Sequence, residues 1–172
     1  MNLKNRRAWL FVAAPVVIAL SSAVGYTYAD RNEQQPQAAR QAEIAAKSRQ
    51  VMPFDLDRTT HRFTKTGTGG VQTVTADDPA DARQVELIRQ HLTEETAAFR
   101  KGDYGDPASI HGGEMPGLRE LEQGHTRIAT RYAQTPSGAQ ITYTTSDPGL
   151  IKALHAWFDA QVTDHGQHAE HG

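Results

Sequence analysis

The sequence contains no cysteine, and its 172 residues include only two tryptophans and three methionines. Without thiols the chain cannot form a disulfide framework, a thiolate metal site or a covalent haem attachment. It also lacks a Gly-x-Ser-x-Gly elbow, a phosphate-binding glycine loop and a His-Glu-x-x-His pair. No complete catalytic motif is therefore present, and the fold must be stabilised by packing alone.

Acidic residues outnumber basic ones once the first few residues are passed. The formal net charge is −2 at pH 7, although Lys4, Arg6 and Arg7 open the chain with no acidic residue nearby. The remainder is therefore more acidic than the whole. Nucleic acids are bound by basic faces that neutralise phosphates, so this balance excludes a nucleic-acid partner.

The N-terminal segment has no charged residue over positions 9–29. A helix of about 20 such residues crosses a membrane, and the preceding basic residues predict that the chain beyond it lies outside the cytoplasm. Residues 1–29 are therefore predicted to be a signal anchor held in the inner membrane, or a signal peptide cleaved after Thr27-Tyr28-Ala29. Both alternatives predict an exported, periplasmic or extracytoplasmic protein.

The rest of the chain divides by composition into three parts. Residues 30–50 are rich in Gln, Ala, Arg and Glu and read as a solvated polar tether. Residues 51–166 carry the apolar patterns of one α+β domain, and residues 167–172 form a His-containing tail that is predicted to be flexible.

An internal repeat dominates the domain. Residues 60–76 and 125–145 each contain two β-rich runs separated by a glycine-containing turn, which is typical of a hairpin. Each hairpin is followed by Asp-Pro, beginning at Asp78 and Asp147, where Asp would cap a helix and Pro would occupy its first turn.

Apolar residues at helical spacing follow each Asp-Pro pair. They are Val85, Ile88, Leu92 and Phe99 in the first helix and Ile151, Leu154, Phe158 and Val162 in the second. The predicted fold is a duplicated strand–strand–helix unit, giving a four-stranded, mostly antiparallel sheet with two helices on one face. Between the halves, residues 102–118 form a long connection of the kind that often carries function.

Eight histidines are many for this length, and their placement carries the functional interpretation. His111 and Met115 flank Gly-Gly-Glu, and an imidazole beside a thioether suits copper(I). His155 lies at the edge of an apolar stripe, with Asp159 four residues later to orient the ring. The competing interpretation is an ordinary turn with a space-filling methionine, together with a histidine bonded to a backbone carbonyl.

Four other histidines lie in the predicted domain. His61 is predicted to point to the same side of its strand as Phe63, and His165 would continue the apolar stripe of the last helix. His91 and His125 are expected to be exposed. The candidate metal ligands are therefore His111, Met115, His155, His61 and His165.

The leading hypothesis is an envelope protein that binds a metal ion, copper in preference to zinc. A second hypothesis is a periplasmic enzyme with a general base, His155 or His111, supported by Asp159 or Glu114. A third is a non-catalytic module that binds another envelope protein, or a haem-binding variant with His and Met as axial ligands.

Three short segments of the sequence resemble those of a family of small exported bacterial proteins. They are Gly69–Val74, Ile110–Gly112 with Met115–Leu118, and Ala153–Gln161 with Asp164–Gly166. The resemblance spans roughly residues 53–166 and implies no mechanism. Members often carry the label aspartate carbamoyltransferase, but this chain lacks the Ser-Thr-Arg-Thr loop and second domain of that enzyme, so its activity is not expected here.

Overall fold

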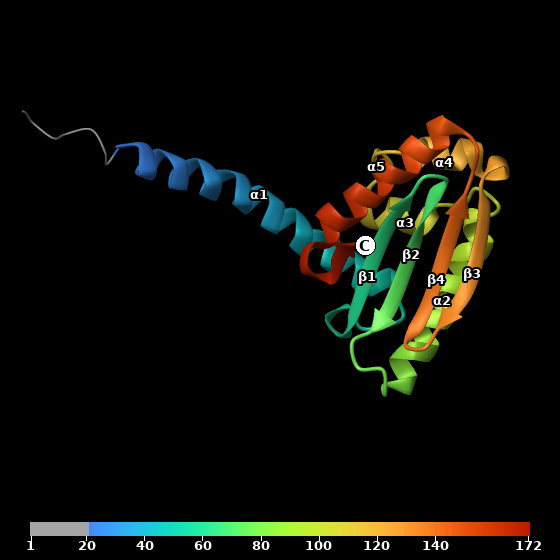
Figure 1. Cartoon of the computed structure of the whole chain (residues 1–172). Coiled ribbons are helices and arrows are strands. Elements are labelled where there is room, and N and C mark those ends of the chain that lie inside the picture. Colours follow the sequence, from blue (N-terminus) through green and yellow to red (C-terminus); the bar gives the residue numbers. More distant parts are fainter. Residues whose placement is uncertain (1–20) are drawn as a thin grey trace, which may run out of the picture. The chain divides into compact units, whose positions relative to one another are not determined.

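The computed structural model describes the backbone of residues 21–172 and the side chains of residues 35–172. The α+β class is confirmed, with five α-helices and a five-stranded mixed sheet in the described chain (Figure 1). The helices are α1 (Ser21–Val51), α2 (Ala82–Phe99), α3 (Gly105–His111), α4 (Leu118–Gly124) and α5 (Pro148–His165). The strands are β1 (Thr59–Thr66), β2 (Gly69–Ala76), β3 (Ala129–Thr135), β4 (Gly138–Thr144) and β5 (Ala169–His171).

The two predicted hairpins form the centre of the sheet. The strand order is β3-β4-β2-β1-β5, and the hairpins join through their second strands, β2 and β4, which run antiparallel. In this register Gly70 lies opposite Tyr143, and Val74 lies opposite Ala139. Side chains alternate along each strand, so one face of the sheet collects the apolar residues.

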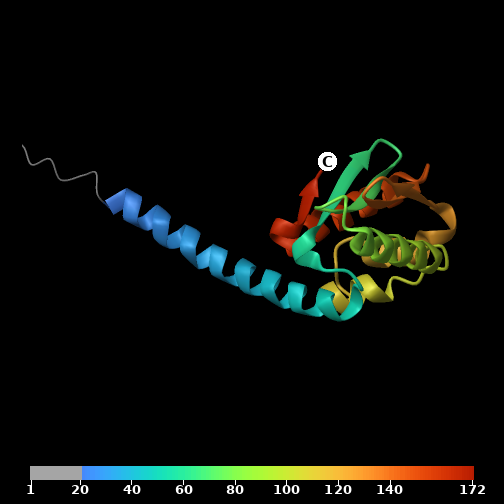
Figure 2. The ribbon, with the colours of Figure 1, turned by 90° about the horizontal axis from the view of Figure 1, so that it is seen from below.

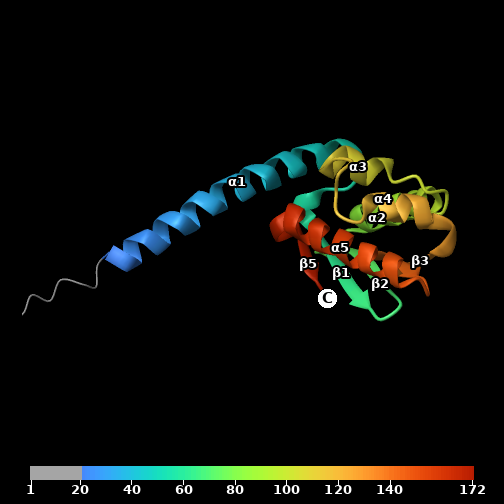
Figure 3. The same ribbon diagram turned by 90° about the horizontal axis from the view of Figure 1, so that it is seen from above.

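The fifth strand differs from the sequence expectation. Ala169–His171 pairs in parallel with β1, with His61 opposite Ala169, and the Gly172 N–H donates to the Phe63 carbonyl at 3.1 Å (Figure 3). The predicted sheet had four strands, and these residues were assigned to a flexible tail. Three residues without β-branched side chains give no strand signal, so the ladder with β1 determines their conformation.

The long helices of the two repeats lie on one face of the sheet (Figures 2 and 3). Helix α2 follows the first hairpin but packs mainly against β4 and β3 of the second. Helix α5 follows the second hairpin and packs against β1, β2 and β5. Each hairpin is thus covered by the helix of the other repeat.

The two helices begin differently. Asp147 caps α5 as predicted, accepting a hydrogen bond from the Gly149 N–H at 2.8 Å, and Pro148 opens the helix. The cap of α2 is Asp81 rather than Asp78, and it accepts from the Gln84 N–H at 3.1 Å. Asp78 instead accepts from the Ala80 N–H in a turn that precedes the helix.

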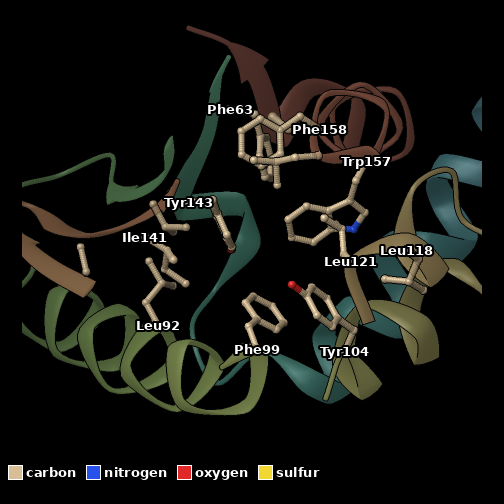
Figure 4. Close-up of a cluster of buried hydrophobic side chains, with 14 of the residues drawn as sticks. Phe63, Leu92, Phe99, Tyr104, Leu118, Leu121, Ile141, Tyr143, Trp157 and Phe158 are labelled. Carbon is tan, nitrogen blue, oxygen red and sulfur yellow. The ribbon is translucent and has the colours of Figure 1, made fainter. Parts of the chain in front are cut away.

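Aromatic side chains fill the space between sheet and helices (Figure 4). Phe63 from β1 and Phe158 from α5 have ring centroids 5.1 Å apart, and Trp157 packs edge-on to Tyr143 at 5.9 Å. Burial of such rings supplies much of the stability of a domain without disulfides. This cluster forms one wall of the candidate site described below.

The connection between the repeats is helical over part of its length. It contains α3 and α4. Gly117 precedes α4 with φ = 79°, and a Cβ there would overlap the backbone of Ala153 on α5. Only glycine adopts this backbone conformation without strain.

Gly117→Ala is therefore expected to lower the free energy of unfolding by at least about 2 kcal/mol, because backbone strain and overlap add. Chemical denaturation measures the change. Gly113→Ala is the matched control, since a Cβ at Gly113 would meet no atom within 4 Å. Equal stability of the two variants would contradict the prediction.

Residues 37–51 of α1 pack on the domain, although all but residue 51 fall in the predicted solvated tether. Ile44 is 1% exposed and Ser48 is fully buried. One isoleucine among alanines and charged residues gives too weak an apolar pattern to reveal such packing. Residues 37–172 form one compact unit.

The predicted membrane segment, residues 9–29, lies mostly outside the described residues. Among the helices that the structure does describe, none combines the length and apolar character needed to span a bilayer.

Candidate histidine site

A small polar cavity lies beneath the sheet, beside the aromatic cluster. Its volume is about 30 Å³, comparable to the volume that one water molecule occupies. Its polar lining comprises His61, His91, His111, His165, Glu95, Asp106, Gln72 and Gln161. So many titratable groups at one buried position are unusual in a domain of this size.

The histidines come from four different elements. His61 lies on β1, and it faces inward because it shares the parity of Phe63. His111 ends α3 and His165 ends α5, while His91 lies on α2. All four residues are buried, with 2–7% of their surface exposed. His61 and His165 thus face inward as predicted, whereas His91 was expected to be exposed and is buried.

Three of the imidazole rings contact one another. The rings of His61 and His165 stack at 5.5 Å with an interplanar angle of 5°. The ring of His111 meets that of His165 edge-on at 4.9 Å. Three segments distant in sequence therefore bring three imidazoles together, and we call this set the histidine cluster (His61, His111 and His165).

His111 is oriented by a carboxylate. Its Nδ1 lies 2.8 Å from Oδ2 of Asp164, and both Asp164 oxygens accept hydrogen bonds of 2.6 Å from the Arg40 guanidinium. Because a carboxylate only accepts, Nδ1 must carry the proton. The lone pair of the neutral ring is then on Nε2.

Two buried nitrogens of the cavity lining have no hydrogen-bond partner among the described residues. They are Nδ1 of His61 and the indole Nε1 of Trp157. Buried polar atoms are normally satisfied, so such atoms point to a bound water or ion.

Burial keeps the histidines neutral. Desolvation, with help from nearby His91, lowers the pKa of His61 to about 4. Desolvation likewise lowers the pKa of His91, His111 and His165. Neutral imidazoles offer a lone pair to a proton or a metal ion at neutral pH.

Asp164 behaves in the opposite sense. Burial alone would raise the pKa of this carboxyl group, but hydrogen bonds from Arg40 and His111 outweigh burial and the pKa is lowered. Asp164 is therefore a carboxylate at neutral pH and holds the Nδ1–H tautomer of His111.

Glu95 is the acid at the other side of the cavity. Desolvation, with a further contribution from nearby Asp106, raises its pKa to about 8. Glu95 is thus protonated at neutral pH.

The other predicted site residues lie elsewhere. Met115 is buried in the apolar core and does not line the cavity. His155 Nε2 lies 3.1 Å from the Thr66 carbonyl and 2.9 Å from the Gly69 carbonyl, at the β1–β2 turn. The structure therefore brings His61, His111 and His165 together and places Met115 and His155 outside this group.

The proposed partners of the predicted bases are also engaged elsewhere. Asp159 forms an ion pair with Lys65 at 2.5 Å, and Glu114 is exposed and pairs with Arg119 at 3.1 Å. The carboxylate that orients a histidine is instead Asp164, which sequence reasoning did not single out.

The cluster is not arranged as a finished metal centre. Within the described residues, no group of three His, Cys, Asp or Glu side chains has positions that could hold one metal ion. Ligand nitrogens must all lie about 2.0–2.1 Å from an ion such as zinc. Any ion at this position therefore requires some rings to turn.

Comparison with protein-family models, with curated proteins and with solved structures finds no match to this chain. The chemistry of the site therefore has to be inferred from its own residues.

Proposed function

We propose that this protein binds one divalent transition-metal ion through the histidine cluster. The observation that carries the proposal is the convergence of three buried, neutral imidazoles on a cavity where His61 Nδ1 has no partner. The polarised His111–Asp164 pair adds support, since metal-binding histidines usually donate their second nitrogen to a carboxylate.

The donor set indicates the class of ion. Imidazole nitrogens suit Cu²⁺, Zn²⁺ and Ni²⁺, and affinities for a given site usually rise from Ni²⁺ to Cu²⁺ and fall again at Zn²⁺. The argument for copper(I) depended on the thioether of Met115, which is packed in the core. We therefore propose Cu²⁺ as the tightest ligand, followed by Zn²⁺.

Binding requires modest movement. The terminal torsion of a histidine has a broad energy minimum, so ring rotation costs little. Asp164 fixes the His111 ring, and the rings of His61 and His165 would turn toward its Nε2. The volume of about 30 Å³ is sufficient for an ion.

The free space inside the cavity, about 30 Å³, suits a water molecule or an ion. An organic ligand would need the surrounding side chains to move apart. An exported location remains part of the proposal, based on the uncharged run at residues 9–29.

Titration of the untagged full-length protein with Cu²⁺ and Zn²⁺ tests the proposal. We expect one ion per chain, and His111→Gln should weaken binding at least about 100-fold because it removes the oriented ligand. His155→Gln is the control, since its ring bonds to carbonyls outside the cavity. Isothermal calorimetry and metal analysis after dialysis provide the readout.

The proposal fails if wild-type protein retains no ion, or if His111→Gln binds both ions as tightly as wild type does. An unchanged affinity in His155→Gln alone supports it.

A further inference from the structure

The histidine cluster is linked to helix α1 by an ion pair. Arg40, in the part of α1 that packs on the domain, donates to Asp164 from Nε and from a terminal nitrogen, both at 2.6 Å. The same guanidinium donates to the His111 carbonyl at 3.3 Å. One side chain of α1 thus contacts both members of the pair that orients the site.

This geometry is more specific than a surface ion pair. Asp164 has a side chain only 6% exposed, whereas half of the Arg40 side chain is open to solvent. A fork of two parallel hydrogen bonds fixes the plane of the carboxylate. The carboxylate plane in turn determines where the His111 ring points, because Asp164 accepts the Nδ1 proton.

Other polar contacts of α1 hold the helix on the domain and are not hydrogen bonds to the cluster. Gln41 donates to the Thr163 carbonyl at 2.9 Å, Ile44 is buried, and Arg49 pairs with Asp57 at 3.1 Å. Arg40 is the residue of α1 that connects this docked segment, residues 37–51, to a ring of the cluster.

We propose that Arg40 is a positioning residue of the metal site, and that ion binding and docking of residues 37–51 stabilise each other. This inference rests on the proposed function. Coupling between two equilibria is reciprocal, so if the docked helix strengthens ion binding, the ion must strengthen docking by the same free energy. Occupancy of the site would thereby be transmitted to the helix that leads toward the N-terminal segment.

The first test measures affinity in the full-length chain. Arg40→Ala is expected to weaken Zn²⁺ binding 10- to 100-fold, the usual effect of losing a residue that orients a ligand. Arg40→Lys should recover part of the lost affinity, since lysine restores the positive charge but not the two parallel hydrogen bonds of the guanidinium. Arg49→Ala is the matched control on the same helix and should stay within about twofold of wild type, as exposed ion pairs contribute little.

Two further measurements separate positioning from simple structural damage. Nitrogen NMR of His111 should report a protonated Nδ1 in wild type and a mixture of tautomers in Arg40→Ala. Hydrogen exchange of residues 37–51 should slow when Zn²⁺ is added to wild type, and should respond less in Arg40→Ala.

The outcomes are distinct. If wild type binds neither Zn²⁺ nor Cu²⁺, the proposed function fails and the coupling fails with it. If wild type binds Zn²⁺ but Arg40→Ala binds equally well, the positioning role alone is overturned. Should Arg40→Ala fail to fold, the decision rests on wild type, where exchange of residues 37–51 that is unaffected by Zn²⁺ overturns the coupling.

Discussion

Replacing Glu95 with glutamine is expected to raise the free energy of unfolding by up to about 5 kcal/mol at pH 9. The folded protein holds this carboxyl proton up to a pKa of about 8, whereas the model value for an unperturbed glutamate is 4.5. Unfolding therefore releases a proton between these values, and stability falls as the pH rises from 4.5 to 8. Glutamine cannot ionise.

The increase in the free energy of unfolding caused by Glu95→Gln should grow with pH, from about 2 kcal/mol at pH 6 to its maximum near pH 9. Denaturant titrations at several pH values of metal-free protein measure it. Glu94→Gln removes the same formal charge from the neighbouring position, which is exposed, and is the matched control. A gain in Glu95→Gln that is independent of pH would contradict the assignment of a protonated buried acid.

Acidification from pH 6.5 to pH 4 should reduce the contribution of His61 to the stability of the metal-free protein by about 2–3 kcal/mol. Glu95 acts in the opposite sense over this interval, so the effect is measured as the difference between wild type and His61→Asn. The pKa of His61 falls to about 4 on folding, from a model value of 6.5. Unfolding then takes up a proton in this interval, so stability is present above pH 6.5 and is lost as the pH falls. His91 on α2, His111 on α3 and His165 on α5 are shifted in the same direction and should steepen the loss.

Chemical denaturation in the presence of a chelator checks this expectation. His61→Asn should reduce the slope of stability against pH by about one proton, which corresponds to about 1.4 kcal/mol per pH unit. A slope of stability against pH that is the same in wild type and in His61→Asn would contradict the burial of a neutral ring at this position.

The sequence predicts much of the fold because local signals coincide with it. Alternating side chains and glycine turns indicate both hairpins, and Asp147-Pro148 marks the start of α5 correctly. The pairing of the hairpins through β2 and β4, and the addition of β5, arise from contacts between distant segments. Neither leaves a local pattern to detect.

Two residues of the candidate site, His91 and Glu95, are indicated by the helical spacing of the sequence. His91 and Glu95 are one helical turn apart, and together with Ile88, Leu92 and Phe99 they continue the buried stripe of α2. Polar residues that fall on an apolar stripe at helical spacing are candidates for a buried site. The apolar members of the stripe alone do not place His91 on it, which is why the apolar pattern predicts an exposed His91.

The link from Arg40 to Asp164 had no such signal. The two residues are 124 positions apart, and Arg40 lies in a segment whose composition resembles a solvated linker. An arginine among glutamines and alanines looks like any exposed charge. Its role depends on α1 docking beside the end of α5, which only the three-dimensional structure reveals.

The exchange of helices between the repeats has a consequence for how the chain folds. Because α2 packs mainly on β4 and β3, and α5 packs on β1 and shares β2 with α2, neither hairpin–helix half could shield the whole apolar side of its hairpin on its own. A peptide limited to residues 59–99 would need a complement, either the second repeat or another molecule of itself. The two halves are therefore expected to fold together, as one cooperative unit.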